Sequence, residues 1–156
     1  MPFRRCRRTF FQMTKACVSR ELRRRLVAEA RGRCAYCHTL TAVTEARLVV
    51  DHIIPEAAGG RTVLDNLCLA CHSCNEFKGT QLRAYDPLTG KHVRIFHPRQ
   101  DRWRDHFRWS PDGSELAGIT PTGRATLLAL KMNHPLLVEA RRLWVAVGWH
   151  PPQEDE

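Results

Sequence analysis

Hydrophobic residues follow two different periods in the first half of the chain. Between residues 19 and 31 they recur every three or four positions, which predicts an amphipathic helix. Ser19 is suited to cap the start of this helix, and Gly32 to end it. The core-facing side would be formed by Leu22, Leu26, Val27 and Ala30.

The pattern changes to that of β-structure at residues 48–55, which are rich in β-branched side chains and predict a strand. Gly59 and Gly60 predict a loop after it, and residues 63–70 predict a return strand. A short helical segment follows at residues 75–78. The predicted order is therefore strand, loop, strand, helix.

The pattern after residue 80 is a mixture of shorter elements. Strands are predicted over residues 91–97 and 115–119, and helices over residues 122–132 and 135–147, with Thr122 capping the first helix. The apolar face of the last helix would be formed by Leu136, Ala140, Leu143, Trp144 and Val147. These elements predict a small α+β extension.

Basic and aromatic residues alternate over residues 102–109, RWRDHFRW. Such a run can stack on bases or line a phosphate track. It can also be an amphipathic strand whose aromatic side chains fill a core, and we favour this second interpretation.

Composition is that of a globular chain, with 43% hydrophobic and 26% charged residues among 156. No apolar run approaches the roughly 20 residues that cross a bilayer, and the basic start lacks the apolar stretch of a secretory signal. We therefore expect a soluble cytoplasmic protein that makes no contact with a membrane.

Positive charge is concentrated at the N-terminus. Residues 1–33 hold 11 of the 25 Lys and Arg residues but only 2 of the 16 Asp and Glu residues, so they carry the whole net charge of +9. This segment could bind a polyanion, or it could be a solvated basic face. Residues 1–15 are expected to be a flexible leader, and Met13 is a second candidate for the natural start.

Four of the seven cysteines form two pairs, Cys34-xx-Cys37 and Cys71-xx-Cys74. Two such turns supply the four thiolates of a closed tetrahedral zinc site. The 33 residues between the pairs exceed the usual gap of roughly 15–20, so a folded segment must lie between them. His38 and His72 are alternative ligands, Cys68 is expected to be a buried small hydrophobe, and the cysteines expected to stay free are Cys6 and Cys17.

The polar residues between the cysteine pairs complete a known pattern. Cys34-xx-Cys37, Asp51-His52-Ile53-Ile54-Pro55, Gly59-Gly60, Asp65-Asn66-Leu67 and Cys71-xx-Cys74-Asn75-xx-Lys78 occur in this order. Together they resemble the HNH endonucleases that have a ββα-metal core. The resemblance covers about residues 20–80, which is less than half of the chain.

The resemblance implies a role for each matching residue. His52 would be the general base, Asn66 would brace the loop and orient His52, and Asp51 and Asn75 would bind one catalytic divalent ion. Cys34, Cys37, Cys71 and Cys74 would hold a structural zinc ion. Because the third motif residue is Asn75 rather than histidine, the oxygen donors favour Mg²⁺ or Mn²⁺. Side chains that could contact phosphates are Lys78, Arg61, Arg23, Arg24 and Arg25.

These observations predict an α+β protein with a zinc-stapled ββα-metal core. The core would span residues 16–82, including the basic helix, and the extension residues 83–156. We expect a metal-dependent endonuclease that hydrolyses DNA phosphodiester bonds. The alternative is a non-catalytic, zinc-stabilised module that binds nucleic acid. The sequence leaves open RNA as a substrate and the oligomeric state.

Overall fold

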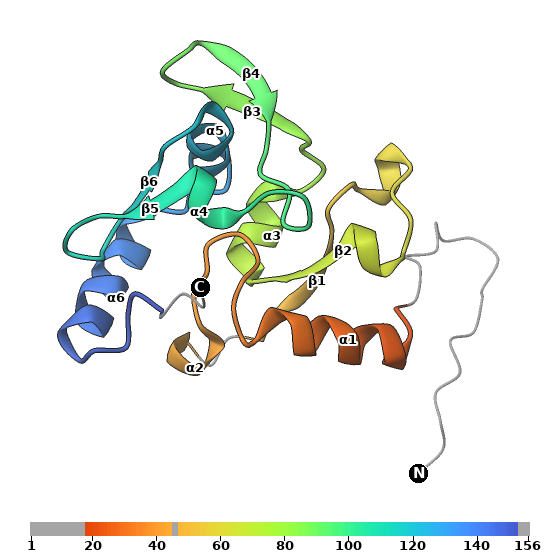
Figure 1. Cartoon of the computed structure of the whole chain (residues 1–156), viewed down its shortest axis with the longest axis horizontal. Coiled ribbons are helices and arrows are strands. Elements are labelled where there is room, and N and C mark those ends of the chain that lie inside the picture. The colour runs from red at the N-terminus through yellow and green to blue at the C-terminus, as the bar shows by residue number, and fades with distance from the viewer. Residues whose placement is uncertain (1–17, 45–46, 153–156) are drawn as a thin grey trace.

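The computed structural model describes residues 18–44 and 47–152. The predicted leader at residues 1–15, together with Cys6 and Cys17, lies outside this described part. A β-hairpin stands between an N-terminal helix and the C-terminal elements (Figure 1). In the part of the chain that the structure describes, none of the helices has the length and apolarity needed to cross a membrane.

Helix α1 spans Arg20–Ala30, close to the predicted residues 19–31. The Ser19 side chain accepts a hydrogen bond from the amide of Leu22 at 3.1 Å, and Arg31 ends the helix in a left-handed conformation with φ 47°. Leu26 is buried against the hairpin, as predicted. Val27 was wrongly placed on this face: it is 57% exposed, because the next residue along a helix is turned by about 100°.

Strands β1 (Val49–His52) and β2 (Leu67–Ala70) form the predicted antiparallel hairpin, in which Asp51 lies opposite Cys68 and His52 lies opposite Leu67. Both strands are shorter than predicted. The 3₁₀ turns η1 (Glu56–Ala58) and η2 (Leu64–Asn66) take up the intervening residues.

Helix α3 spans His72–Lys78 and begins earlier than predicted, because the Cys71 sulfur accepts a hydrogen bond from the Cys74 amide and caps the helix. A short helix, α2, spans Thr41–Thr44.

The extension contains two further two-stranded sheets and three helices. Strands β3 (Arg83–Asp86) and β4 (Lys91–Arg94) form one sheet, and β5 (Phe107–Trp109) and β6 (Leu116–Gly118) form the other. The helices are α4 (Trp103–His106), α5 (Pro121–Ala129) and α6 (Pro135–Ala146). The cap of α5 is Thr120, whose hydroxyl accepts a hydrogen bond from the Gly123 amide, so the prediction of Thr122 was wrong.

One hydrophobic cluster joins the cysteine turns to the extension. Tyr36, Ile53 and Ala70 pack in the same cluster as Phe107 and Leu130. Trp103 and Phe107 are buried in it, so these two aromatic side chains fill a core as predicted. The prediction of one strand over residues 102–109 was wrong, because the first half of this run forms α4 and only its end forms β5. The boundary at residue 82 stays a prediction.

The predicted apolar face of α6 is wrong at Leu136, Leu143 and Val147, whereas Ala140 and Trp144 are half-buried. Leu136 and Leu143 are 76% and 70% exposed, whereas Val138 and Arg141 are buried. The helix is turned this way because the Arg141 guanidinium reaches inward to the side-chain oxygen of Asn133 at 3.2 Å.

Candidate active site and metal centre

The four predicted zinc ligands meet at one point. The sulfur atoms of Cys34, Cys37, Cys71 and Cys74 all lie within 4.8 Å of one another, and those of Cys37 and Cys71 are 3.9 Å apart. Sulfurs at the corners of a tetrahedron with Zn–S bonds of about 2.3 Å lie about 3.8 Å apart. The cluster therefore fits a structural zinc ion.

The neighbouring histidines lie outside this cluster. The ring of His38 stacks on Trp103 with 4.3 Å between ring centroids, and His72 lies on the exposed side of α3, 3.8 Å from Glu76. Cys68 is also separate, because it faces Asp51 and is buried as predicted. The four cysteines form the donor set on their own.

The surroundings of the thiols favour a bound cation. Burial raises the pKa of the Cys34 thiol well above its ordinary value, so the thiolate form of this residue depends on a nearby positive charge. The extension brings one positive charge, that of the completely buried Arg141, close to the other three thiols. Burial lowers the pKa of this guanidinium, and the negative charges of Cys37, Cys74 and Cys71 oppose that shift.

Asp51 faces the interior of the protein. Its Oδ2 atom accepts a hydrogen bond from the Tyr36 hydroxyl at 2.7 Å, and its Oδ1 atom accepts one from the Lys78 ammonium at 3.0 Å. Burial raises the pKa of Tyr36 well above its ordinary value, and the charges of Cys68 and Asp51 add to this. The hydroxyl is therefore protonated and able to donate.

Lys78 has a different environment from the one predicted. Its side chain is completely buried and also donates to the backbone oxygen of His52 at 2.8 Å. The structure thus places its ammonium in the interior, between β1 and α3, instead of on a surface where it would meet a phosphate. The sequence did not identify Tyr36 or Lys78 as partners of Asp51.

His52 is the next residue on β1, and neighbouring residues of a strand point to opposite faces. Its Nε2 atom lies 2.9 Å from the Thr62 hydroxyl and 3.9 Å from a carboxylate oxygen of Glu56. The imidazole and the Asp51 carboxylate are thus held by different residues. Nothing in the sequence pattern singled out Thr62, which follows the glycine loop.

The loop beyond His52 is held by Asn66. The Asn66 side chain accepts a hydrogen bond from the Ile54 amide at 2.8 Å and donates to the backbone oxygens of Ile54 and Arg61 at 2.9 and 3.0 Å. Gly60 makes this closure possible, because a Cβ atom at that position would lie 1.7 Å from the Ile54 oxygen. These bonds fix the backbone on both sides of Thr62.

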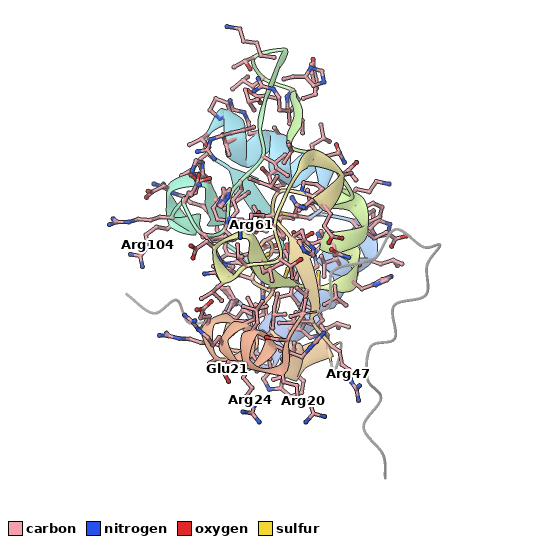
Figure 2. All side chains as sticks on the ribbon, turned by 90° about the vertical axis from the view of Figure 1, so that its right-hand side faces the viewer. Arg20, Glu21, Arg24, Arg47, Arg61 and Arg104 are labelled. Atoms are coloured by element: carbon pink, nitrogen blue, oxygen red, sulfur yellow. The ribbon has the colours of Figure 1, made fainter. Side chains whose placement is uncertain are left out.

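Asn75 lies on α3, one turn before Lys78, and is half-buried. Residues three apart share a helix face, so Asn75 and Lys78 lie on the same side of α3 as it faces β1. Arg61 is exposed next to Thr62 in the loop, and Figure 2 shows it near the centre of the face that carries this loop. Arg23, Arg24 and Arg25 are also exposed, on α1.

Comparison with protein families gave one match, which covers about a third of the chain. Residues 34–86 match the HNH endonuclease family model. The match starts at the first cysteine of the metal cluster and includes Asp51, His52, Asn66 and Asn75. It confirms the resemblance seen in the sequence and supports a nuclease-type function that acts on nucleic acid. A comparison with curated proteins gave no match.

Proposed function

We propose that the protein hydrolyses phosphodiester bonds of DNA at the end of β1, with His52 as the general base. The observation that carries this proposal is the position of His52 within the HNH match, where its ring is held at 2.9 Å by Thr62 on a loop that Asn66 closes. A general base must be held in a fixed orientation towards the proton that it removes.

The hydrogen bond to Thr62 assigns different tasks to the two ring nitrogens. When Nε2–H donates to the Thr62 hydroxyl oxygen, Nδ1 carries the lone pair of the neutral imidazole. Nδ1 then takes a proton from a water molecule, the water oxygen bonds to phosphorus, and the bond to the leaving 3′ oxygen breaks. Histidine is suited to this step because its ordinary pKa is about 6.5.

Asp51 and Asn75 are the proposed ligands of a catalytic Mg²⁺ or Mn²⁺. A carboxylate and an amide oxygen are donors that suit such hard cations. An ion bound there would stabilise the negative charge that develops on the phosphoryl oxygens. Each carboxylate oxygen has two acceptor positions, so Asp51 has capacity for an ion beside Tyr36 and Lys78.

The metal requirement is tested by incubating supercoiled plasmid with the protein in Mg²⁺, in Mn²⁺ and in EDTA. The proposal expects nicking in at least one of the metals and none in EDTA. Asp51→Asn also removes the partner of the buried Lys78, so its nicking is compared at equal concentration of folded protein. It should be reduced at low Mg²⁺ and recover in part at high Mg²⁺. Nicking that is equally fast in EDTA would contradict the proposal.

The second candidate is a zinc-stabilised module that binds nucleic acid without cutting it. The buried pair of Asp51 and Lys78 favours this candidate, since an acid neutralised by an ammonium is a common structural arrangement. It expects the protein to retain plasmid in a binding gel and to leave both DNA and RNA uncut in every metal. The same gel with labelled RNA shows which nucleic acid is preferred.

A further inference from the structure

A pocket of about 750 Å³ lies outside the surroundings of His52 described above. Its walls come from α1, the turn that carries Cys34, strand β2 and residues 96–104. A cavity of this size falls within the range of about 300–1,000 Å³ that is usual for ligand sites. The proposed cleavage step does not use it, although its lining includes Cys34 and part of the basic and aromatic run at residues 102–109.

Five arginines gather around this pocket from two segments that are far apart in the sequence. They are Arg31, Arg33, Arg99, Arg102 and Arg104, against the two acids Glu29 and Asp101. Figure 2 shows Arg104 projecting outward from the fold. The pocket therefore carries a formal excess of three positive charges over the described residues that line it.

Both acids of the lining are already bound by arginines. Glu29 accepts a hydrogen bond from Arg99 at 2.7 Å, and Asp101 accepts two from Arg94 at 2.6 and 2.7 Å. Asp101 also accepts one from the His97 amide at 2.8 Å, which fixes the segment that carries Arg102. The acids thus organise the wall, and their charges are largely balanced within it.

Apolar side chains form part of the lining, which we call the floor. They are Leu69, Phe96, Pro98 and Trp103, and among these Leu69, Phe96 and Trp103 expose only 5%, 2% and 8% of their surface. Arginine guanidinium groups bind phosphate oxygens with directed hydrogen bonds, and apolar or aromatic surfaces accept the sugar and base. A charged rim above an apolar floor therefore matches the two halves of a nucleotide.

Arg99 connects this pocket to the hairpin of the candidate active site. Its Nε atom donates to the backbone oxygen of Leu67 at 2.7 Å, and Leu67 is the residue opposite His52 in the β1–β2 pairing. The pocket and His52 are therefore built on the same pair of strands.

We propose that this arginine-lined pocket binds one nucleotide unit of the substrate strand, at a position separate from the bond that is cut. The proposal rests on the proposed function only in taking a nucleic-acid strand as the ligand. The arginines hold the phosphate, and the floor holds the attached sugar and base.

The test measures the affinity of a fluorescein-labelled 16-nucleotide DNA strand in EDTA, where no cleavage can occur. The double variant Arg102→Gln/Arg104→Gln removes two exposed charges from the rim. The control is Arg108→Gln/Arg142→Gln, which removes two exposed charges from positions that do not line the pocket. Zinc content and the unfolding midpoint of each protein establish that both variants are folded.

The proposal expects the rim variant to bind at least tenfold more weakly and the control to change by less than twofold. The slope of log Kd against log salt should fall by about 1.4 in the rim variant, because each phosphate of a single strand that a cationic side chain neutralises adds about 0.7 to this slope. Equal weakening of both variants would show that the strand is attracted by the positive charge of the protein as a whole, and this would overturn the proposal. Tight binding of a free mononucleotide that displaces the strand would also overturn it, in favour of a small-molecule site.

The result is separate from that of the cleavage assay. Strand binding is measured in EDTA, so it does not depend on cleavage. If the protein binds the strand through the rim but never cuts, the proposed function fails and the pocket stands. If it cuts and the rim variant binds normally, the pocket fails and the proposed function stands.

Discussion

The ammonium of Lys78 lies 3.0 Å from the Oδ1 atom of Asp51, and both side chains are inside the protein, at 0% and 5% exposure. Asp51 is therefore both a proposed ligand of the catalytic ion and one half of a buried ion pair. A divalent ion would have to share the carboxylate with the ammonium or displace it. This arrangement couples the stability of the hairpin to the chemistry proposed for it.

Removing one member of this pair should strongly destabilise the protein. Lys78→Met leaves a buried carboxylate without its cation, which typically costs about 3–5 kcal/mol. The double variant Lys78→Met/Asp51→Asn should recover much of this loss, because no uncompensated charge remains. Urea unfolding measures both values. Equal losses in the single and double variants would show that the pair does not stabilise the fold through its charges.

Zinc removal should change tryptophan fluorescence. The Trp103 indole donates a hydrogen bond at 2.8 Å to the backbone oxygen of Tyr36, which lies between Cys34 and Cys37. Chelation releases this turn and exposes the indole to water, so the emission maximum should move to longer wavelength and return when zinc is added. Cys71→Ser should show the shifted spectrum without chelator. A spectrum unaffected by complete zinc removal would contradict the shared core.

Gly60→Ala should disrupt the active-site loop while sparing the zinc cluster. The added Cβ would lie 1.7 Å from the Ile54 oxygen and 2.8 Å from the Asn66 amide nitrogen, so the loop that carries Thr62 must shift. We expect nicking to fall at least tenfold with full zinc content. The control is Gly90→Ala, where φ is +70° but no atom lies within 4 Å, and the cost should be about 1 kcal/mol with normal nicking. Normal nicking by Gly60→Ala would contradict the role given to this loop.

Acid should weaken the attachment of α5 to the β3–β4 sheet. Arg124 donates two hydrogen bonds to Asp86, at 2.8 and 2.9 Å, and holds the pKa of this carboxyl well below its ordinary value. A carboxyl whose pKa is lowered by folding stabilises the protein above its unfolded pKa of about 3.9, and this contribution is lost as the pH falls further. The stability difference between wild type and Asp86→Asn should therefore be larger at pH 6 than at pH 3. Zinc release at low pH affects both proteins and cancels in the difference. A difference that does not change with pH would contradict this assignment.

Local signals predicted much of the core from the sequence. The paired cysteines, the capping Ser19 and the turn glycines act over a few residues, and the structure places the cysteine cluster, α1 and the hairpin accordingly. Strand β3 was missed, because its burial does not follow the polarity of its residues: Asp86 is inside and Tyr85 is exposed. The available signal was the DPLTG turn that follows, in which Asp86 accepts hydrogen bonds from the Leu88 amide and the Thr89 hydroxyl.

Tertiary packing decided what the sequence did not predict. The apolar residues of α6 suggested one buried face, but Arg141 lies inside. Its guanidinium interacts with the negative charges of the cysteine cluster and lies 5.0 Å from the centroid of the Trp109 ring. Lys78 similarly follows Cys74 by one helical turn, and only the packing of α3 on β1 shows that its ammonium reaches Asp51. Contacts between segments far apart in sequence leave no periodic signal.

The measurement that tests the central claim most directly compares plasmid nicking by His52→Ala with nicking by His72→Ala. His72 is a matched control, since its side chain is 79% exposed on α3 and it is outside the zinc cluster. Both variants are compared at equal zinc content and stability. We predict that His52→Ala loses nicking by at least 100-fold, because general-base catalysis contributes about 10²–10⁴-fold. His72→Ala should keep the wild-type rate. Full activity in His52→Ala, or equal loss in both variants, would contradict this prediction.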